Sequence, residues 1–370
     1  RADALGARGP LRGSPIVARR SAPDPLGGMV SRYSLRTDYQ ATKRWWLVVR
    51  RACLPFLIAL AAPLAARGEA IYAFALDGSG NFDHRLLRFD SASPWELEQA
   101  LPINGELIDV TQVSLEFDPV TRELYAFGFW QCQVLCPPTA IDPMRIDPLT
   151  GDLVHLAWPG LPAIEFGADK DIHPLTRELR LFSQSGGNFR YSIESLELHV
   201  DQSLNIPGYA YSVAHMPTAE EGGGVETFAI FYQDGEERRL VRIGGVGGVP
   251  PASSGEVTVI GPVDVQGEVA GFDISASGEA FLSTYDYIQL PGSDDRYVSW
   301  LYTIDLETGA TQELGTIATQ PSTFVSGIAV APPGLVFGAP EIPALSRTGL
   351  ATFVLFLAIV ALWRSRLYSS

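Results

Sequence analysis

From residue 71 to residue 337 the chain alternates short apolar stretches with turns rich in Asp, Pro, Thr and Gly. Four sites share one arrangement, in which an apolar strand ends in a turn that carries Pro, Ser or Thr: residues 115–125, 168–179, 271–281 and 327–335. A second arrangement, with Asp and Thr-Gly between two strands, recurs at 144–156 and 301–315. Period-two alternation broken by such turns is typical of β-hairpins.

Pairing the two arrangements gives units of four strands, which repeat at a similar interval. The units lie at about 110–157, 164–200, 209–261 and 268–318, and the remaining pieces 71–103 and 325–337 together make a fifth. In that fifth unit the inner strand comes from the C-terminal piece. Closing one unit from both ends removes the unpaired edges of the array. The pattern therefore predicts an all-β domain over 71–337, a β-propeller of about five four-stranded blades. A ring of six or seven blades and an open β-sandwich are the alternatives.

The residues between 166 and 191, FGADKDIHPLTRELRLFSQSGGNFRY, carry the most polar part of the pattern. They resemble a bacterial family known as domain of unknown function 4394, in which Gly, Asp, Pro, Arg, Ser and Asn recur at fixed positions. The positions that fall in step are Phe166, Gly167, Asp169, Pro174, Arg177, Arg180, Ser183, Gly187, Asn188 and Arg190. The stretch VSLEFDPVTRELYAFG, which begins at Val113, is similar to another repeat of that family. The resemblance covers roughly residues 70–335 and implies a secreted, propeller-like domain without an established activity.

Charge divides the chain into three parts. Residues 1–70 carry 12 Lys/Arg against 4 Asp/Glu, residues 71–340 carry 12 against 37, and residues 341–370 carry 3 against 1. An acidic body argues against nucleic acid as its partner. Residues 1–43 lack apolar periodicity, and we expect them to be disordered or not part of the true protein. The basic start, the apolar run 54–66 and the small residues after it predict a signal peptide over 44–70, with an uncleaved anchor as the alternative.

The C-terminal end has the three parts of a sorting signal. Residues 338–347 read as a linker with a motif, and 348–370 as a transmembrane helix with a basic tail. The tail resembles the IPTL-CTERM type of bacterial sorting signal in its motif Ile342, Pro343, Ala344, Leu345 and Ser346. The resemblance implies a membrane sorting enzyme as a partner, acting on this tail, with the bilayer contacted through 348–366. We expect an exported protein that is anchored in the inner membrane or sorted to the surface of a Gram-negative bacterium.

The candidate ligand-binding residues are Asp169, Asp171, His173, Asn188 and Arg190. Two aspartates two apart on a strand face the same side and offer carboxylates to Ca²⁺. The alternative is that they cap turns. Asn188 and Arg190 follow a Gly-Gly turn and present donors to an anionic or sugar-like ligand at the channel mouth, or they tie blades together.

Other chemistry has less support in the sequence. The histidines lack the spacing of a zinc site, no nucleophile motif is present, and no catalytic residue or cofactor other than a possible Ca²⁺ is predicted. In an exported chain Cys132 and Cys136 are expected to form a disulfide. We therefore expect a non-enzymatic propeller with a binding or structural role and an unidentified extracellular ligand. A secreted propeller enzyme, such as a lyase or glycan hydrolase with its site at the channel mouth, is the alternative.

Overall fold

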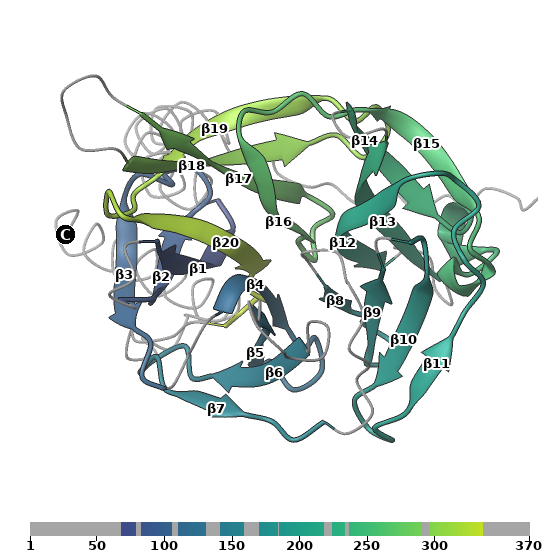
Figure 1. Ribbon diagram of the computed structural model, residues 1–370, viewed down its shortest axis with the longest axis horizontal. Coiled ribbons are helices and arrows are strands. Elements are labelled where there is room, and N and C mark those ends of the chain that lie inside the picture. The colour runs from purple at the N-terminus through teal and green to yellow at the C-terminus, as the bar shows by residue number, and fades with distance from the viewer. Residues whose placement is uncertain are drawn as a thin grey trace, which may run out of the picture. The chain divides into compact units, whose positions relative to one another are not determined.

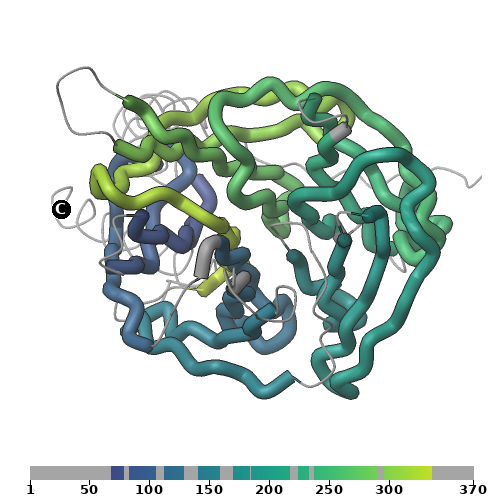
Figure 2. The backbone as a smooth tube through the Cα atoms, in the orientation of Figure 1, coloured from purple at the N-terminus to yellow at the C-terminus, as the bar shows by residue number. Residues whose placement is uncertain are grey.

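The computed structural model describes residues 68–335, with gaps at 79–82, 106–109, 131–140, 159–169, 184, 218–223, 234–236 and 290–295. The described residues form five antiparallel sheets of four strands, arranged around one axis as the blades of a propeller (Figure 1, Figure 2). The predicted five-bladed propeller is confirmed, and the six-bladed, seven-bladed and sandwich alternatives are wrong.

The blades are numbered in chain order, and the innermost strand of each is named first. The first blade contains β20 (Thr323–Val330), β1 (Ala70–Asp77), β2 (Arg85–Asp90) and β3 (Leu97–Pro102). The second contains β4 (Val110–Phe117), β5 (Leu124–Trp130), β6 (Ile141–Ile146) and β7 (Leu153–His155). The third contains β8 (Asp171–Ile172), β9 (Glu178–Phe182), β10 (Asn188–Ser192) and β11 (Leu198–Val200). The fourth contains β12 (Tyr209–Pro217), β13 (Val225–Gln233), β14 (Glu237–Ile243) and β15 (Val257–Pro262). The fifth contains β16 (Glu268–Ile274), β17 (Ala280–Ile288), β18 (Arg296–Ile304) and β19 (Thr311–Ile317).

The first blade closes the ring, because its strands come from both ends of the domain. β20 pairs antiparallel with β1, with Ile71 opposite Val330 and Ala73 opposite Ile328. The inner strand of this blade therefore comes from the C-terminal piece, as the sequence pattern predicts. This blade alone among the five joins strands from the two ends of the described domain.

Apolar side chains on the inner strands fill the space between neighbouring blades. Leu115 and Phe117 of β4 pack with Tyr72 of β1, and Ile172 of β8 packs with Phe127 of β5. Because alternate residues of a strand face opposite sides, these apolar positions leave Ser114 and Glu116 on the other side of β4. The alternation of the sequence thus places polar side chains on a second face of the innermost strand.

Two glycines let the inner strand of the first blade approach both of its neighbours. A Cβ atom at Gly327 of β20 would lie 2.5 Å from the carbonyl oxygen of Val113 on β4. A Cβ atom at Gly271 of β16 would lie 2.6 Å from the backbone nitrogen of Ile328 on β20. Side chains at these two positions would push the inner strands apart. Glycine is therefore needed for the close approach of β4, β20 and β16.

Several predicted features fall outside the described residues: the signal peptide 44–70 except its last three residues, Cys132 and Cys136, the motif 342–346 and the helix 348–370. The last residue of the predicted signal peptide, Ala70, begins β1. In the part of the chain that the structure describes, no helix has the length and the apolar character needed to cross a bilayer.

Candidate functional site

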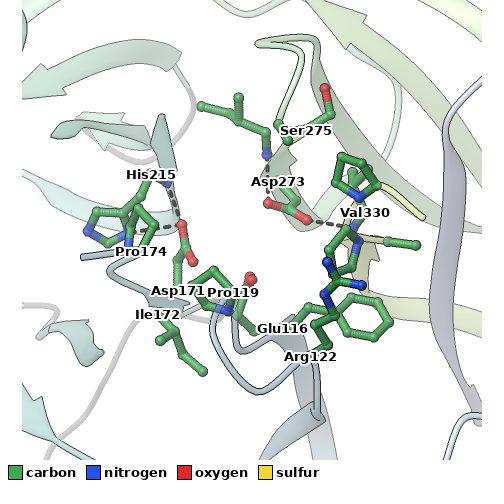
Figure 3. A pocket seen from close by; sticks show the side chains of 16 residues that line it. Glu116, Pro119, Arg122, Asp171, Ile172, Pro174, His215, Asp273, Ser275 and Val330 are labelled. Carbon is green, nitrogen blue, oxygen red and sulfur yellow. Dashed lines mark hydrogen bonds and ion pairs between the residues drawn. The ribbon is translucent and has the colours of Figure 1, made fainter. Parts of the chain in front are cut away.

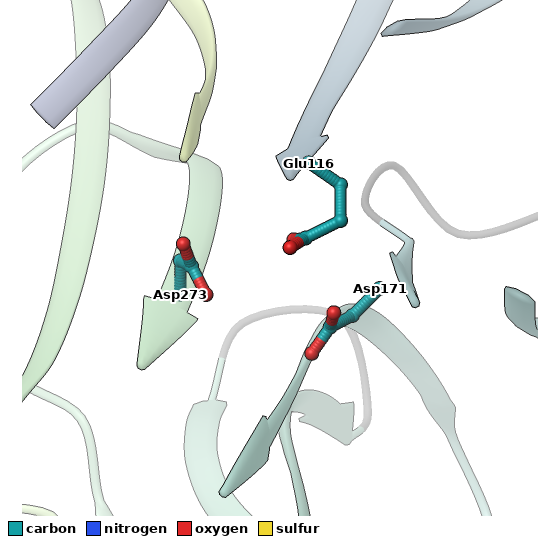
Figure 4. A group of neighbouring side chains, drawn as sticks. All are labelled: Glu116, Asp171 and Asp273. Atoms are coloured by element: carbon teal, nitrogen blue, oxygen red, sulfur yellow. The ribbon is translucent and has the colours of Figure 1, made fainter. Parts of the chain in front are cut away.

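Three carboxyl groups from three blades meet at the axis, where the inner strands end. Glu116, Asp171 and Asp273 point toward one another, and their ligand oxygens all lie within 4.8 Å (Figure 4). The exposed fractions of the three residues are 7%, 4% and 5%. We call these residues the carboxylate triad.

The repeat of the sequence positions the triad. Each member is the penultimate residue of its inner strand, followed by a buried apolar residue, Phe117, Ile172 or Ile274. The next residue begins the turn, and its N–H donates to the carbonyl oxygen of a glutamate just before or at the start of the following strand. These pairs are Asp118 to Glu123 at 2.9 Å, His173 to Glu178 at 2.9 Å and Ser275 to Glu279 at 2.8 Å. The three carboxyls thus occupy one equivalent position in the second, third and fifth blades.

Asp171 is held by the fourth blade. Its Oδ2 accepts hydrogen bonds from the backbone N–H of His215 and from Nδ1 of the same ring, the latter at 2.8 Å. Burial raises the pKa of Asp171 to about 7, although hydrogen bonds from the backbone N–H groups of His215 and Ile172 and from the Glu116 carboxyl act in the opposite direction. Burial lowers the pKa of His215 to about 3, so this imidazole is neutral at physiological pH. A neutral ring that donates through Nδ1 leaves Nε2 as an acceptor, and Nε2 is buried without a partner among the described residues.

Asp273 is held by its own blade and by the first. Its Oδ1 accepts the N–H of Ile274 at 2.6 Å, and its Oδ2 accepts the N–H of Val330 at 2.5 Å. Burial raises the pKa of Asp273 to about 8, and the charge of Asp171 adds to this shift. Burial therefore favours the protonated forms of Asp171 and Asp273 near neutral pH unless a cation compensates their charge.

A cavity of about 330 Å³ opens onto the triad (Figure 3). We call it the axial pocket. Its wall is built from the triad and the turns that follow the inner strands, and it includes Arg122, His215, Ser275, Pro119, Pro174 and Pro332. Prolines in three of these turns fix the backbone around the opening. The pocket gives the buried carboxyls an entrance from one end of the axis.

A buried hydroxyl lies on the same side of β4 as the triad. Ser114 is two residues before Glu116, so the strand period turns both side chains to one face. Ser114 is 0% exposed, and its Oγ has no hydrogen-bond partner in the described part of the chain. Buried hydroxyls are normally satisfied, so this one indicates a polar occupant of the axis such as water.

The inner strands are bridged at their other ends. Gln112 of β4 donates from Nε2 to the hydroxyl of Tyr211 on β12 at 2.9 Å. These strands belong to the second and fourth blades, which are not neighbours, so the bond crosses the axis. The triad and this bridge lie toward opposite ends of β4.

The structure brings only part of the predicted site together. Asp171 belongs to the triad, and the His173 ring lies 5.1 Å from the His215 ring, centroid to centroid. Nδ1 of His173 accepts the N–H of Thr176 at 3.2 Å, so His173 caps its turn. Asp169 lies outside the described residues.

Asn188 and Arg190 lie on β10, the third strand from the axis, and the structure does not bring them to the triad. Asn188 accepts from Arg180 at 2.8 Å and donates to the Ala252 carbonyl in the fourth blade at 2.9 Å. Arg190 forms ion pairs with Glu178 and Asp201, both at 2.8 Å. Both side chains thus join parts of the protein to one another.

Glu116 and Asp273 are the site residues that the sequence reasoning missed. The available signal was an acidic residue followed by an apolar one and then a turn residue, in Glu116-Phe117-Asp118, Asp171-Ile172-His173 and Asp273-Ile274-Ser275. The three positions align when the repeats are laid over one another.

The donor set of the triad consists of oxygen atoms alone. Hard divalent cations such as Ca²⁺ and Mg²⁺ prefer carboxylate and water oxygens, and Ca²⁺ takes about six to eight of them. Three carboxylates supply part of such a shell, and the remaining positions would face the axial pocket. Glu116, Asp171 and Asp273 therefore fit a hard cation.

Comparisons with known proteins place the fold in a family. The profile of a family described as "Domain of unknown function (DUF4394)" matches residues 85–329. No curated protein matches the chain. Similar solved structures include a hypothetical protein from Leishmania major, with 12% identity and a TM-score of 0.35 over 58% of this chain and 71% of that one. An oligogalacturonate lyase from Vibrio parahaemolyticus has 11% identity and a TM-score of 0.31 over 64% of this chain and 61% of that one. Likenesses this distant carry no information about activity.

Proposed function

The chain belongs to the family described as a domain of unknown function (DUF4394), and we propose that it is a non-enzymatic binding propeller. In this proposal the axial pocket is the binding site, and the carboxylate triad holds a hard divalent cation, with Ca²⁺ as the first candidate. The observation that carries the proposal is the convergence of three buried carboxyl groups at the open end of the axis.

The charge of the triad is the physical reason. Two carboxylate charges no more than 4.8 Å apart repel by at least about 3.5 kcal/mol at an effective dielectric constant of about 20. Three such charges in one buried site need protons or a cation to compensate them. The pocket admits a hydrated ion, and the unpartnered Ser114 hydroxyl offers a further oxygen to a water molecule along the axis.

Cation binding is tested by calorimetry and thermal unfolding of the domain in chelator-treated buffer with added CaCl₂, MgCl₂ or MnCl₂. The key variant is Glu116→Gln, because its amide still donates to Asp171 while it removes one carboxylate. We expect saturable 1:1 binding that stabilises the wild-type protein by about 2.7 kcal/mol at a cation concentration of about 100 Kd, and loss of that stabilisation in Glu116→Gln.

Glu313→Gln is the matched control, since Glu313 is exposed on the outer strand β19. It should keep the wild-type response. A folded wild-type protein that binds none of the three ions, or a Glu116→Gln variant that binds as tightly as wild type, would overturn the cation site.

The second part of the proposal concerns the cellular location of the protein. We propose that the propeller is exported and then anchored in the envelope or sorted to the surface, on the support of the predicted signal peptide and the tail at 342–370. Deleting 342–370 should release the domain into the medium, as followed by cell fractionation. Retention of the shortened protein in the membrane would contradict the role of the tail. A purified sorting enzyme that fails to cleave the full chain would contradict processing.

A secreted enzyme is the second candidate, favoured by one observation. A carboxyl group whose pKa lies near neutral can exchange a proton with a bound substrate, and the pKa of Asp171 is raised to about 7. A lyase or glycan hydrolase would release new sugar ends from a polysaccharide panel and lose that activity in Asp171→Asn. No product from any member of the panel, with cation binding intact, favours the binding role.

A further inference from the structure

The side chain of Arg122 distinguishes the axial pocket from a simple cation site. Arg122 lies on the pocket wall in the turn between β4 and β5 (Figure 3). It is exposed, and its guanidinium has no hydrogen-bond or ion-pair partner among the described residues. Its φ of 61° places a residue with a side chain in the left-handed region. Such backbone strain is uncommon and is found often at ligand-binding turns.

The third blade contains the same turn, but there the arginine has an ion-pair partner. Arg177 has the position of Arg122 in the third blade and a similar φ of 53°. Its guanidinium crosses to the preceding blade and binds Asp118, with Nε at 3.0 Å and Nη2 at 2.5 Å from Oδ2. Asp118 is 0% exposed and begins the turn of the second blade. In this pair, a turn arginine is neutralised by the first turn residue of the blade before it.

In the part of the chain that the structure describes, Arg122 meets no such acceptor. In the first blade, Ala331 has the position that Asp118 has in the second. The N–H of Ala331 donates to the carbonyl of Ala70 at 2.8 Å, just as the N–H of Asp118 donates to the carbonyl of Glu123. Ala331 and the following Pro332 have no acceptor in their side chains, and both line the axial pocket with Arg122. The repeat therefore leaves the Arg122 guanidinium on the wall of the axial pocket without a hydrogen-bond or ion-pair partner among the described residues.

We propose that the axial pocket binds a small anionic ligand, whose carboxylate or phosphate group joins the cation on the triad to the guanidinium of Arg122. This inference rests on the proposed cation site. A cation on three carboxylates leaves coordination positions toward the pocket, and an anionic oxygen fills them while a second oxygen accepts from Arg122. Without the cation, the anion loses its partner on the triad, and any carboxyl there that is ionised repels it. Binding of the cation and of the anion is therefore mutually dependent.

The experiment compares three probes that share one sugar ring: glucose 6-phosphate, glucuronate and glucose. Each is titrated into the full domain by calorimetry, with and without saturating CaCl₂. We expect one or both charged probes to bind in the presence of Ca²⁺, at least about tenfold more weakly in its absence, and glucose not to bind. The better of the charged probes identifies the anionic group that the pocket accepts.

Two substitutions test Arg122 directly. Arg122→Ala should weaken binding of the charged probe by about tenfold to a hundredfold, the effect of losing a charge-assisted hydrogen bond, and leave Ca²⁺ affinity within about twofold. Arg145→Ala is the matched control, since Arg145 is an exposed arginine outside the pocket wall that pairs with Glu123. It should bind like wild type.

Ala331→Asp introduces the acceptor that the third-blade turn uses, so it should occupy Arg122 and reduce anion binding while the arginine is retained. Ala331→Asn has nearly the same size without the charge, and it should keep anion binding. Ca²⁺ binding that no charged probe alters, or equal probe binding by wild type and Arg122→Ala, would overturn this inference and leave the cation site standing. Absence of Ca²⁺ binding would overturn both.

Discussion

The triad predicts that the cation-free domain loses stability as the pH rises from 7 to 9. The pKa values of Asp171 and Asp273 are raised to about 7 and about 8 in the folded protein, whereas an unfolded aspartate has a pKa of about 3.9. A raised folded pKa gives stability that is lost as the pH rises through that value. Integrating proton release over pH 7 to 9 with about 1.4 kcal/mol per pH unit gives a loss of about 1.8 kcal/mol, most of it from Asp273.

Other titrating groups act in different pH ranges. Burial lowers the pKa values of His84, His173 and His215, so their contribution changes below about pH 6.5, the unfolded value. The pKa values of Asp118 and Asp201 are lowered, so these carboxyls lose their stabilising effect in acid. The interval from pH 7 to 9 therefore reports mainly on the triad.

The substitution Asp273→Asn tests whether the triad causes the loss of stability between pH 7 and 9. The amide cannot ionise, so the loss between pH 7 and 9 should shrink from about 1.8 to about 0.4 kcal/mol, the share of Asp171. Asparagine also presents an NH₂ group to one of the two backbone donors, Ile274 or Val330. That mismatch lowers stability by about 1–3 kcal/mol at every pH and leaves the slope unaffected.

The assay is thermal and urea unfolding of the domain in chelator-treated buffer at half-unit pH steps. For a domain of this size about 1 kcal/mol corresponds to roughly 2–4 °C in Tm, so wild type should lose about 4–7 °C between pH 7 and 9. Asp264→Asn is the control, because Asp264 is exposed and outside the pocket, and it should keep the full loss. Added CaCl₂ should reduce the loss, since cations compete with protons for carboxylates. A flat profile in wild type, or an unchanged slope in Asp273→Asn, would refute the electrostatic argument.

The remaining predictions concern the frame around the site. Asp118→Ala should lower the unfolding free energy by about 3–5 kcal/mol in urea, because it leaves Arg177 without its buried partner; a loss below about 1 kcal/mol would contradict that pair's role. Gly327→Ala should prevent the close approach of β20 to β4, which would be seen as loss of cooperative unfolding. Gly334→Ala is the control, because open space surrounds Gly334, and it should lower the unfolding free energy by only about 1 kcal/mol because of the positive φ at that position. Asn188→Ala should lower the unfolding free energy by about 1–3 kcal/mol, because the hydrogen bonds to Arg180 and Ala252 are lost, and it should leave Ca²⁺ affinity unchanged. Weaker Ca²⁺ binding by the folded variant would show that Asn188 contributes to the cation site.

The blade pattern could be predicted because it depends on local chemistry. Asp118 and Pro119 form a turn for reasons that act within a few residues, with the Asp side chain accepting the N–H of Val120 at 2.9 Å. The first blade followed from the unpaired pieces at either end, since a sheet edge needs a partner. Each of these features is visible in a short window of sequence.

The site was harder to predict because it depends on which strand is innermost. Alternation with a period of two looks the same in the first strand of a blade as in the third, so Asn188 and Arg190 could not be distinguished from channel residues. Glu116 lies between Leu115 and Phe117 and reads as the exposed side of a half-buried strand. In the folded protein its carboxyl group lies beside those of Asp171 and Asp273, which are more than fifty residues away in sequence. A short window of sequence does not reveal such a contact.

The closing of the ring by β20 also sets an order for folding. Ala73 pairs with Ile328, 255 residues later, so β1 has no inner neighbour until nearly the whole domain has been synthesised. When β20 arrives, it supplies at one time the partner of β1 and the close contacts with β4 and β16. Such distant pairing slows folding and leaves sheet edges open in the nascent chain. A chain that stops before Thr323 lacks the strand that joins three blades, so its remaining strands stay exposed to other chains.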